Sequence, residues 1–132
     1  MKQVYNILGY DTISKGLKIY FDRHQWGSTE LPDFVGALEE AWQASGNQSM
    51  GSDFNLTNWC DTWLKSSGIN ILEPIVELNA DGTLKSLQVN QSNGLRGQNR
   101  LRKQKISIAI YEKAFSKGDM PFVIENVVIS EH

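Results

Sequence analysis

Apolar residues in the first half of the chain recur at intervals of three and four, the spacing of amphipathic helices. This pattern predicts about four helices. The first covers residues 1–8, and Gly9 follows at the position of a C-terminal cap. The second begins at Asp11 or Thr12 and ends at Gly27.

The third and fourth helices carry clearer signals at their first turns. Pro32 fits a first-turn position that needs no amide hydrogen, and Asp33 suits the positive end of the helix dipole. Asn55 is expected to cap the fourth helix, which Gly68 would end. We interpret all four tryptophans as packing residues, on the helical stripes or at a helix end: Trp26, Trp42, Trp59 and Trp63.

After Gly68 the apolar period changes from about 3.6 to 2, which indicates β-strands. Pro74 limits its strand to an edge or a bulge, and Asp81-Gly82 predicts a tight hairpin turn. Another turn is expected at Lys117-Gly118-Asp119. The four predicted strands cover residues 71–78, 83–90, 106–111 and 122–129.

Helices followed by antiparallel strands indicate an α+β fold, with a helical segment leading into a β-sandwich-like domain. We expect two domains, at residues 1–68 and 69–132. A four-stranded sheet needs a second layer, and nothing precedes Met1 to cap the first helix. Both ends therefore look cut, and we expect the chain to be a piece of a longer protein.

Composition narrows the classes of function. The 132 residues carry a net charge of −2, so no overall basic field favours a nucleic acid. No apolar run approaches the ~20 residues that span a bilayer, and no signal peptide is recognisable. The single cysteine, Cys60, excludes an intrachain disulfide and weakly favours a reducing compartment. We expect a cytoplasmic protein that binds neither nucleic acid nor membrane.

The sequence shows no catalytic or metal-binding motif. It contains no H-E-x-x-H, no glycine-rich phosphate loop and no G-x-S-x-G. His24 and His132 stand far apart, and neither has a ligand partner at helical spacing, so His24 is interpreted as a partly buried residue at a helix end. We therefore predict no catalytic residues and no metal ligands, and substrate-binding residues stay unknown.

Three other groups have both a functional and a structural interpretation. Glu39-Glu40 could serve acid-base chemistry, but adjacent helical residues diverge, which favours a solvated face. Cys60 has no nearby base and lies on the tryptophan stripe, which favours a buried, inert thiol. A cluster of cations could meet RNA or an acidic surface, but it has no interleaved aromatics, which favours a solvated loop leading into a strand. Its members are Arg96, Arg100, Arg102, Lys103 and Lys105.

Five stretches of the sequence form an ordered set: Gly16-Leu17-Lys18-Ile19-Tyr20, His24-Gln25-Trp26-Gly27-Ser28-Thr29, Ala37-Leu38-Glu39-Glu40-Ala41, the tryptophan helix from Leu56 to Gly68, and the basic strand from Leu101 to Tyr111. In this order and spacing they resemble the zinc aminopeptidases of the aminopeptidase N type. The resemblance covers nearly the whole chain.

The resemblance implies that residues 1–68 are the last helices of a thermolysin-like catalytic domain and that residues 69–132 begin the β-sandwich that follows. It also implies that the zinc ligands and catalytic residues of the family lie upstream of Met1. The full-length family member would bind zinc and remove N-terminal residues from peptides. This chain would then be an inactive scaffold fragment.

Two alternatives stay open. The chain could be a free-standing module that binds a protein through exposed strand edges or through residues 96–105. RNA binding has the least support.

Overall fold

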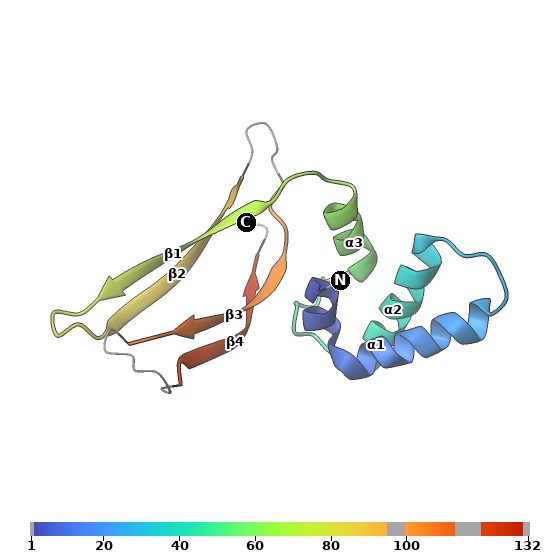
Figure 1. The fold of residues 1–132 in the computed structure, drawn as a ribbon, viewed down its shortest axis with the longest axis horizontal. Coiled ribbons are helices and arrows are strands. Elements are labelled where there is room, and N and C mark those ends of the chain that lie inside the picture. The colour runs from blue at the N-terminus through green and yellow to red at the C-terminus, as the bar shows by residue number, and fades with distance from the viewer. Residues whose placement is uncertain (1, 95–99, 113–119, 131–132) are drawn as a thin grey trace.

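We analysed a computed structural model of the chain, which describes residues 2–94, 100–112 and 120–130. Within these ranges three helices precede four strands, and the strands form two separate antiparallel pairs (Figure 1). The α+β class predicted from the sequence is confirmed. The turn expected at residues 117–119 and His132 lie outside the described residues.

Helix α1 (Lys2–His24) contains both of the first two predicted helices. Gly9 interrupts it with φ 75° and ψ 167°, a conformation open to glycine, and the helix resumes at once. The predicted break at Gly9 is therefore present, but the count of about four helices is not confirmed, because Gly9 bends α1 without inserting a loop. Gly16 lets α1 approach the next helix closely, since a Cβ there would lie 2.7 Å from Leu38 Cδ2.

Helix α2 (Leu31–Ser45) begins and ends as its sequence predicts. Pro32 lies in the first turn, and the Asp33 carboxylate accepts a hydrogen bond of 2.9 Å from the Glu30 amide. Gly46 ends the helix in the left-handed conformation, with φ 64°.

Helix α3 (Leu56–Leu64) is capped by Asn55, whose side chain accepts from the Asn58 amide, as predicted. It ends at Leu64, four residues before the expected stop at Gly68. Residues 65–69 instead form a bent connection to the strands, which leaves Gly68 (φ 85°) between helix and sheet.

The hydrophobic core lies in the helical part (residues 2–64). The largest fully buried side chains there are Ile7, Met50 and Leu56. Trp42 and Trp59 are buried and Trp63 packs against the core, but Trp26 is 100% exposed. The interpretation of Trp26 as a packing residue is therefore wrong: it lies in the turn after α1 with a positive φ of 63°.

Strands β1 (Asn70–Leu78) and β2 (Leu84–Asn93) form one hairpin. Its turn contains Gly82 with φ 85°, but the Asn79 amide pairs with the Thr83 carbonyl, so the loop is one residue longer than the predicted two-residue turn. Pro74 lies in a strand with one paired side, which confirms its prediction as an edge residue.

Strands β3 (Gln104–Ile110) and β4 (Phe122–Ile129) form the second pair. The register shifts between Ile106 and Ile108, and Asn126 on β4 has a positive φ of 60°. Each described sheet has two strands, so the predicted β-sandwich is not confirmed. Apolar residues consequently stay open to solvent, including Val76 at 53% and Leu78 at 60% exposure.

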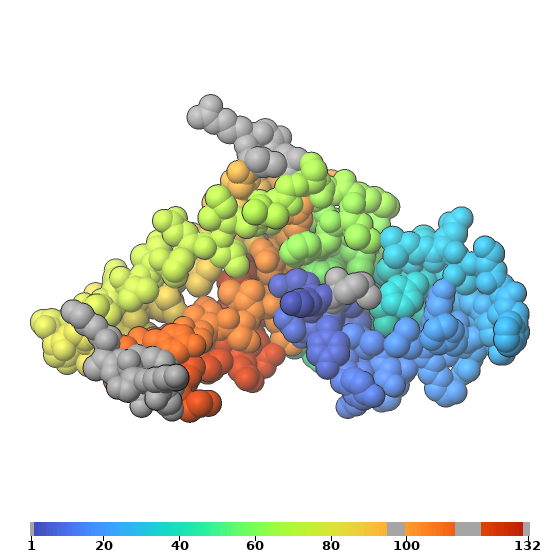
Figure 2. All heavy atoms as spheres, in the orientation of Figure 1, coloured from blue at the N-terminus to red at the C-terminus, as the bar shows by residue number. Residues whose placement is uncertain are grey.

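The two parts of the chain meet near α3 and β3. Figure 2 shows green and dark blue atoms of the helical part against orange atoms of the strand part (β1 to β4) in the middle of the molecule. Trp59 Nε1 donates to the Lys103 carbonyl at 2.7 Å, and Val128 of β4 packs against the helical core.

Candidate functional site

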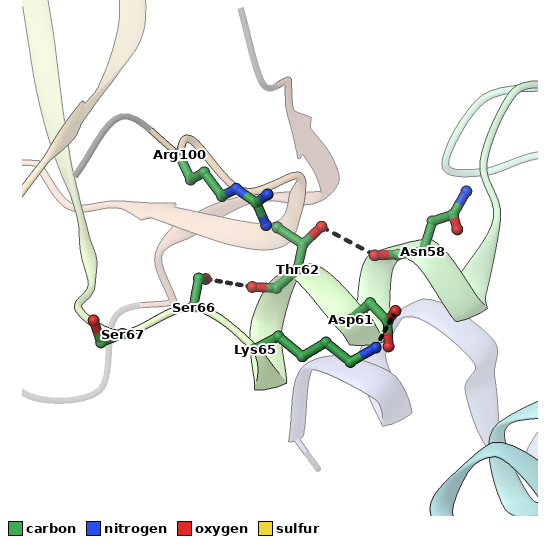
Figure 3. A pocket seen from close by; sticks show the side chains of 7 residues that line it. All are labelled: Asn58, Asp61, Thr62, Lys65, Ser66, Ser67 and Arg100. Carbon is green, nitrogen blue, oxygen red and sulfur yellow. Dashed lines mark hydrogen bonds and ion pairs between the residues drawn. The ribbon is translucent and has the colours of Figure 1, made fainter.

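One pocket lies along α3 and the residues that follow its C-terminal end (Figure 3). Its volume is about 740 Å³. Asparagine, aspartate, threonine, lysine, serine and arginine side chains line it: Asn58, Asp61, Thr62, Lys65, Ser66, Ser67 and Arg100. This lining is polar, so the pocket suits polar or charged groups better than an apolar ligand.

The polar groups of this pocket mostly bind one another. Thr62 Oγ1 donates to the Asn58 carbonyl at 3.0 Å, and Ser66 Oγ donates to the Thr62 carbonyl. Lys65 pairs with Asp61 at 2.6 Å, with both side chains more than half exposed. Hydroxyls that donate back into their own helix are not activated as nucleophiles, so the geometry favours packing or weak binding over catalysis.

A second pocket of about 460 Å³ lies where α3 meets the residues before β3. Lys103 and Asp53 form an ion pair of 3.5 Å there, and the Asp53 side chain is 84% exposed. The Lys103 side chain is only 18% exposed, so the pair is open to solvent on its carboxylate side alone. This pocket marks a junction between the two parts of the chain.

The basic cluster predicted as a solvated loop is largely buried where it is described. Arg102 is 4% and Lys105 9% exposed, while Arg100 is exposed. Arg96 lies outside the described residues. The interpretation is wrong for Arg102, which lies against the end of α3, and for Lys105, which is buried within β3 opposite Val128.

Arg102 is the most heavily bonded of these cations. Its guanidinium donates to Ser66 and Ser67 after α3, and it lies 5.3 Å from the centre of the Trp63 ring. The sequence carried a weak signal for this position, since the period-two alternation of Ile106 and Ile108 extends back through Gln104 to Arg102.

Glu39 and Glu40 do not share a solvated face. Glu40 is exposed and pairs with Arg23 at 2.9 Å. Glu39 is 9% exposed, and its carboxylate accepts from the Thr57 amide at 3.0 Å and from Gln43 Nε2 at 3.1 Å. The prediction is therefore wrong for Glu39, which binds the first turn of α3.

Cys60 is buried, as expected. Burial, together with the nearby charges of Asp61 and Glu39, raises the pKa of its thiol. A higher pKa leaves less thiolate at neutral pH, so the position does not favour a nucleophile.

His24 is partly buried at the end of α1, as expected, and its ring lies 5.5 Å from that of Tyr20.

Within residues 2–94, 100–112 and 120–130, no three His, Cys, Asp or Glu side chains gather as a metal site requires. The described residues do not make up a zinc site. In the same ranges, no helix has both the length and the apolar character to cross a bilayer.

Comparison with known proteins gives one consistent result. The chain is 35% identical over 117 residues to aminopeptidase N of Streptomyces lividans, in an alignment that covers 85% of the chain. The chain is homologous to a segment of aminopeptidase N. The aminopeptidase N of Lactobacillus delbrueckii subsp. lactis is 34% identical over 85 residues, or 64% of the chain. That of Escherichia coli (strain K12) is 25% identical over 91 residues, or 69% of the chain.

These matches confirm the resemblance to the aminopeptidase N family stated from the sequence. The chain spans 12% of the Streptomyces aminopeptidase N and 8% of the Lactobacillus one. What matches is thus one segment of a much longer peptidase. No protein-family model matches the chain.

Proposed function

We propose that this chain is a scaffold segment of a zinc-dependent aminopeptidase. In this proposal residues 1–68 are the last helices of its thermolysin-like catalytic domain, and residues 69–132 begin its β-sandwich. The observation that carries the proposal is the 35% identity to aminopeptidase N over 117 residues. The order of helices and then antiparallel strands in the structure supports it.

The side chains at the pockets support a scaffold role. Their hydroxyls and charges are bonded within α3 or across the junction, which positions elements rather than reacting atoms. The full-length enzyme would supply zinc, bind peptides and remove their N-terminal residues. A cytoplasmic location is part of the same proposal.

The first test is of activity. We expect the purified chain to bind no stoichiometric zinc by mass spectrometry and to hydrolyse no aminoacyl amide above the blank. The aminopeptidase N of Escherichia coli serves as the positive control. Robust hydrolysis that depends on added zinc would refute an inactive scaffold.

The second test is of the scaffold role. The matching segment of the Streptomyces lividans aminopeptidase N is replaced by this chain, and the folded chimera is expected to keep its zinc and its peptidase activity. A chimera that folds and binds zinc, but has no activity, would contradict a purely structural role.

A protein-interaction module is the second candidate, favoured by the open strand edges. Each described strand pairs on one side only, and the face of β1 that carries Val76 is exposed. If this face associates, sedimentation shows oligomers that Val76→Lys disrupts and that Gln88→Lys, on the opposite face, leaves intact. A monomer at every concentration, with no bound partner, would count against this function.

A further inference from the structure

The connection between the helical and strand parts has the features of a hinge. Helix α3 ends at Leu64 and β1 begins at Asn70, so only residues 65–69 join them. Gly68 has φ 85° in this connection, a conformation that most other residues avoid. Short connections that contain such a residue absorb large changes in backbone angles when two parts of a protein move.

Arg102 forms hydrogen bonds on both sides of Gly68. Before the glycine, its Nη2 donates to the Ser66 carbonyl at 3.2 Å, to Ser66 Oγ at 2.8 Å and to the Ser67 carbonyl at 3.2 Å. After the glycine, Asn70 Oδ1 accepts from the Arg102 amide at 3.2 Å and from Nη1 at 3.5 Å. One side chain on a third segment thus holds both ends of the connection.

Asn70 extends this arrangement into the sheets. Its Nδ2 donates to the Arg100 carbonyl at 2.9 Å and to Asn93 Oδ1 at 3.3 Å. The first residue of β1, the last residue of β2 and the segment before β3 are therefore joined at one point. Asn70 thus fixes Arg102 within the strand part, and a rotation about Gly68 would break the bonds from Arg102 to Ser66 and Ser67.

The environment of Arg102 suits a guanidinium and not another cation. Its acceptors are neutral oxygens, including carbonyls just after the C-terminal end of α3, where the helix dipole favours positive charge. Trp63 provides a flat surface at 5.3 Å, and no ion pair of Arg102 occurs among the described residues. The planar fork reaches several acceptors at once, which a lysine ammonium cannot do.

We propose that Arg102 is a hinge lock: by bonding both sides of Gly68, it fixes the direction of the strand part relative to the helical part. The inference goes beyond the scaffold function and does not depend on it, because it concerns motion within this chain. A chain unrelated to any peptidase activity could still have this lock.

The test measures the distance between the two parts. Spin labels are placed at two exposed positions, through Lys15→Cys on α1 and Gln88→Cys on β2, in a Cys60→Ala background. Pulsed electron paramagnetic resonance then reports the distribution of distances between the labels. With Arg102 present we expect one narrow distribution, and with Arg102→Met we expect its width to increase about twofold while far-ultraviolet circular dichroism stays unchanged.

Lys103→Met is the matched control. It also removes a cation that links the two parts, but its ion-pair partner, Asp53, lies outside residues 65–69. We expect the narrow distribution to persist in this variant. Equal broadening in both variants would overturn the proposal, as would a narrow distribution in folded Arg102→Met.

If Arg102→Met loses its helical signal, Arg102→Lys and Asn70→Ala are measured in its place. Arg102→Lys keeps the charge but not the fork, and Asn70→Ala removes the acceptor beyond Gly68 while keeping the arginine. We expect broadening in both variants. A distribution as narrow as that of the parent in both would refute the lock.

Discussion

Two adjacent glutamates show how much the surroundings of a side chain decide its role. The Glu39 carboxylate accepts a hydrogen bond from the Thr57 amide in the first turn of α3, while Glu40 forms an exposed pair with Arg23. The first amides of a helix have no partners within the helix, so a buried carboxylate there satisfies a donor and meets the positive end of the dipole. Glu39 thereby joins α2 to α3.

This difference predicts unequal effects on stability. We expect Glu39→Ala to lower the free energy of unfolding by about 1 to 3 kcal/mol, because it removes a part-buried hydrogen bond from the Thr57 amide to a charged acceptor. The matched control Glu40→Ala should change it by less than about 0.5 kcal/mol. Urea denaturation followed by circular dichroism measures both. Equal losses would show that Glu39 does not hold α3 in this way.

At the scale of elements, α1 depends on one backbone conformation. Gly9 has φ 75° and ψ 167°, a region populated almost only by glycine, and the bend lets Ile7 and Leu8 reach the core. A Cβ at Gly9 would meet nothing within 4 Å, so the backbone conformation, and not a lack of space, requires glycine at this position.

We expect Gly9→Ala to lower the free energy of unfolding by about 1 to 3 kcal/mol. Gly46→Ala is the control, since Gly46 also has open space around it but lies in the left-handed region, where alanine costs about 1 kcal/mol. Thermal and urea unfolding of the two variants shows which of them loses more free energy of unfolding. A larger loss for Gly46→Ala would contradict this account of the bend.

The hairpin turn between β1 and β2 has its own pH dependence. Hydrogen bonds from the Thr83 hydroxyl and amide to the carboxylate lower the pKa of Asp81. Because the pKa of Asp81 is lower in the folded state, its carboxylate stabilises the folded state. This stabilisation is fully present above the unfolded pKa of about 3.9 and is lost as pH falls through the folded pKa.

We expect a nuclear magnetic resonance titration of the Asp81 carboxyl to show a midpoint below its usual range. Thr83→Val removes the hydroxyl donor and keeps the amide, so the midpoint should move part of the way back. An unchanged midpoint in Thr83→Val would mean that the hydroxyl does not stabilise the carboxylate.

Local signals in the sequence were sufficient for much of the secondary structure. Asn55, Pro32 and the alternating isoleucines of β3 each act on neighbours within a few residues, and their elements form as predicted. Arg102 and Glu39 were misinterpreted because their partners lie 36 and 18 residues away. No short-range pattern reports such contacts, so their burial could be known only from the fold.

At the scale of the whole molecule, the two parts differ in how they are stabilised. The helical part has a buried core, whereas the strand part has two-stranded sheets with few buried apolar residues, such as Ile129. Isolated two-stranded sheets are marginally stable in water, because little apolar surface offsets the ordering of the backbone. The free energy of local opening should therefore be lower for the strands than for the helices.

Hydrogen exchange measured by mass spectrometry tests this difference. We expect amides in the β1–β2 hairpin to exchange at least about tenfold faster than amides in the middle of α2. Leu56→Ala, which opens a cavity in the helical core, should accelerate exchange in all three helices while the hairpin keeps its rate. If the hairpin were protected as strongly as α2, or accelerated by Leu56→Ala to the same extent as the helices, the two parts would unfold as one cooperative unit. Contacts at the junction of α3 and β3, and not the packing within each part alone, would then determine the stability of both parts.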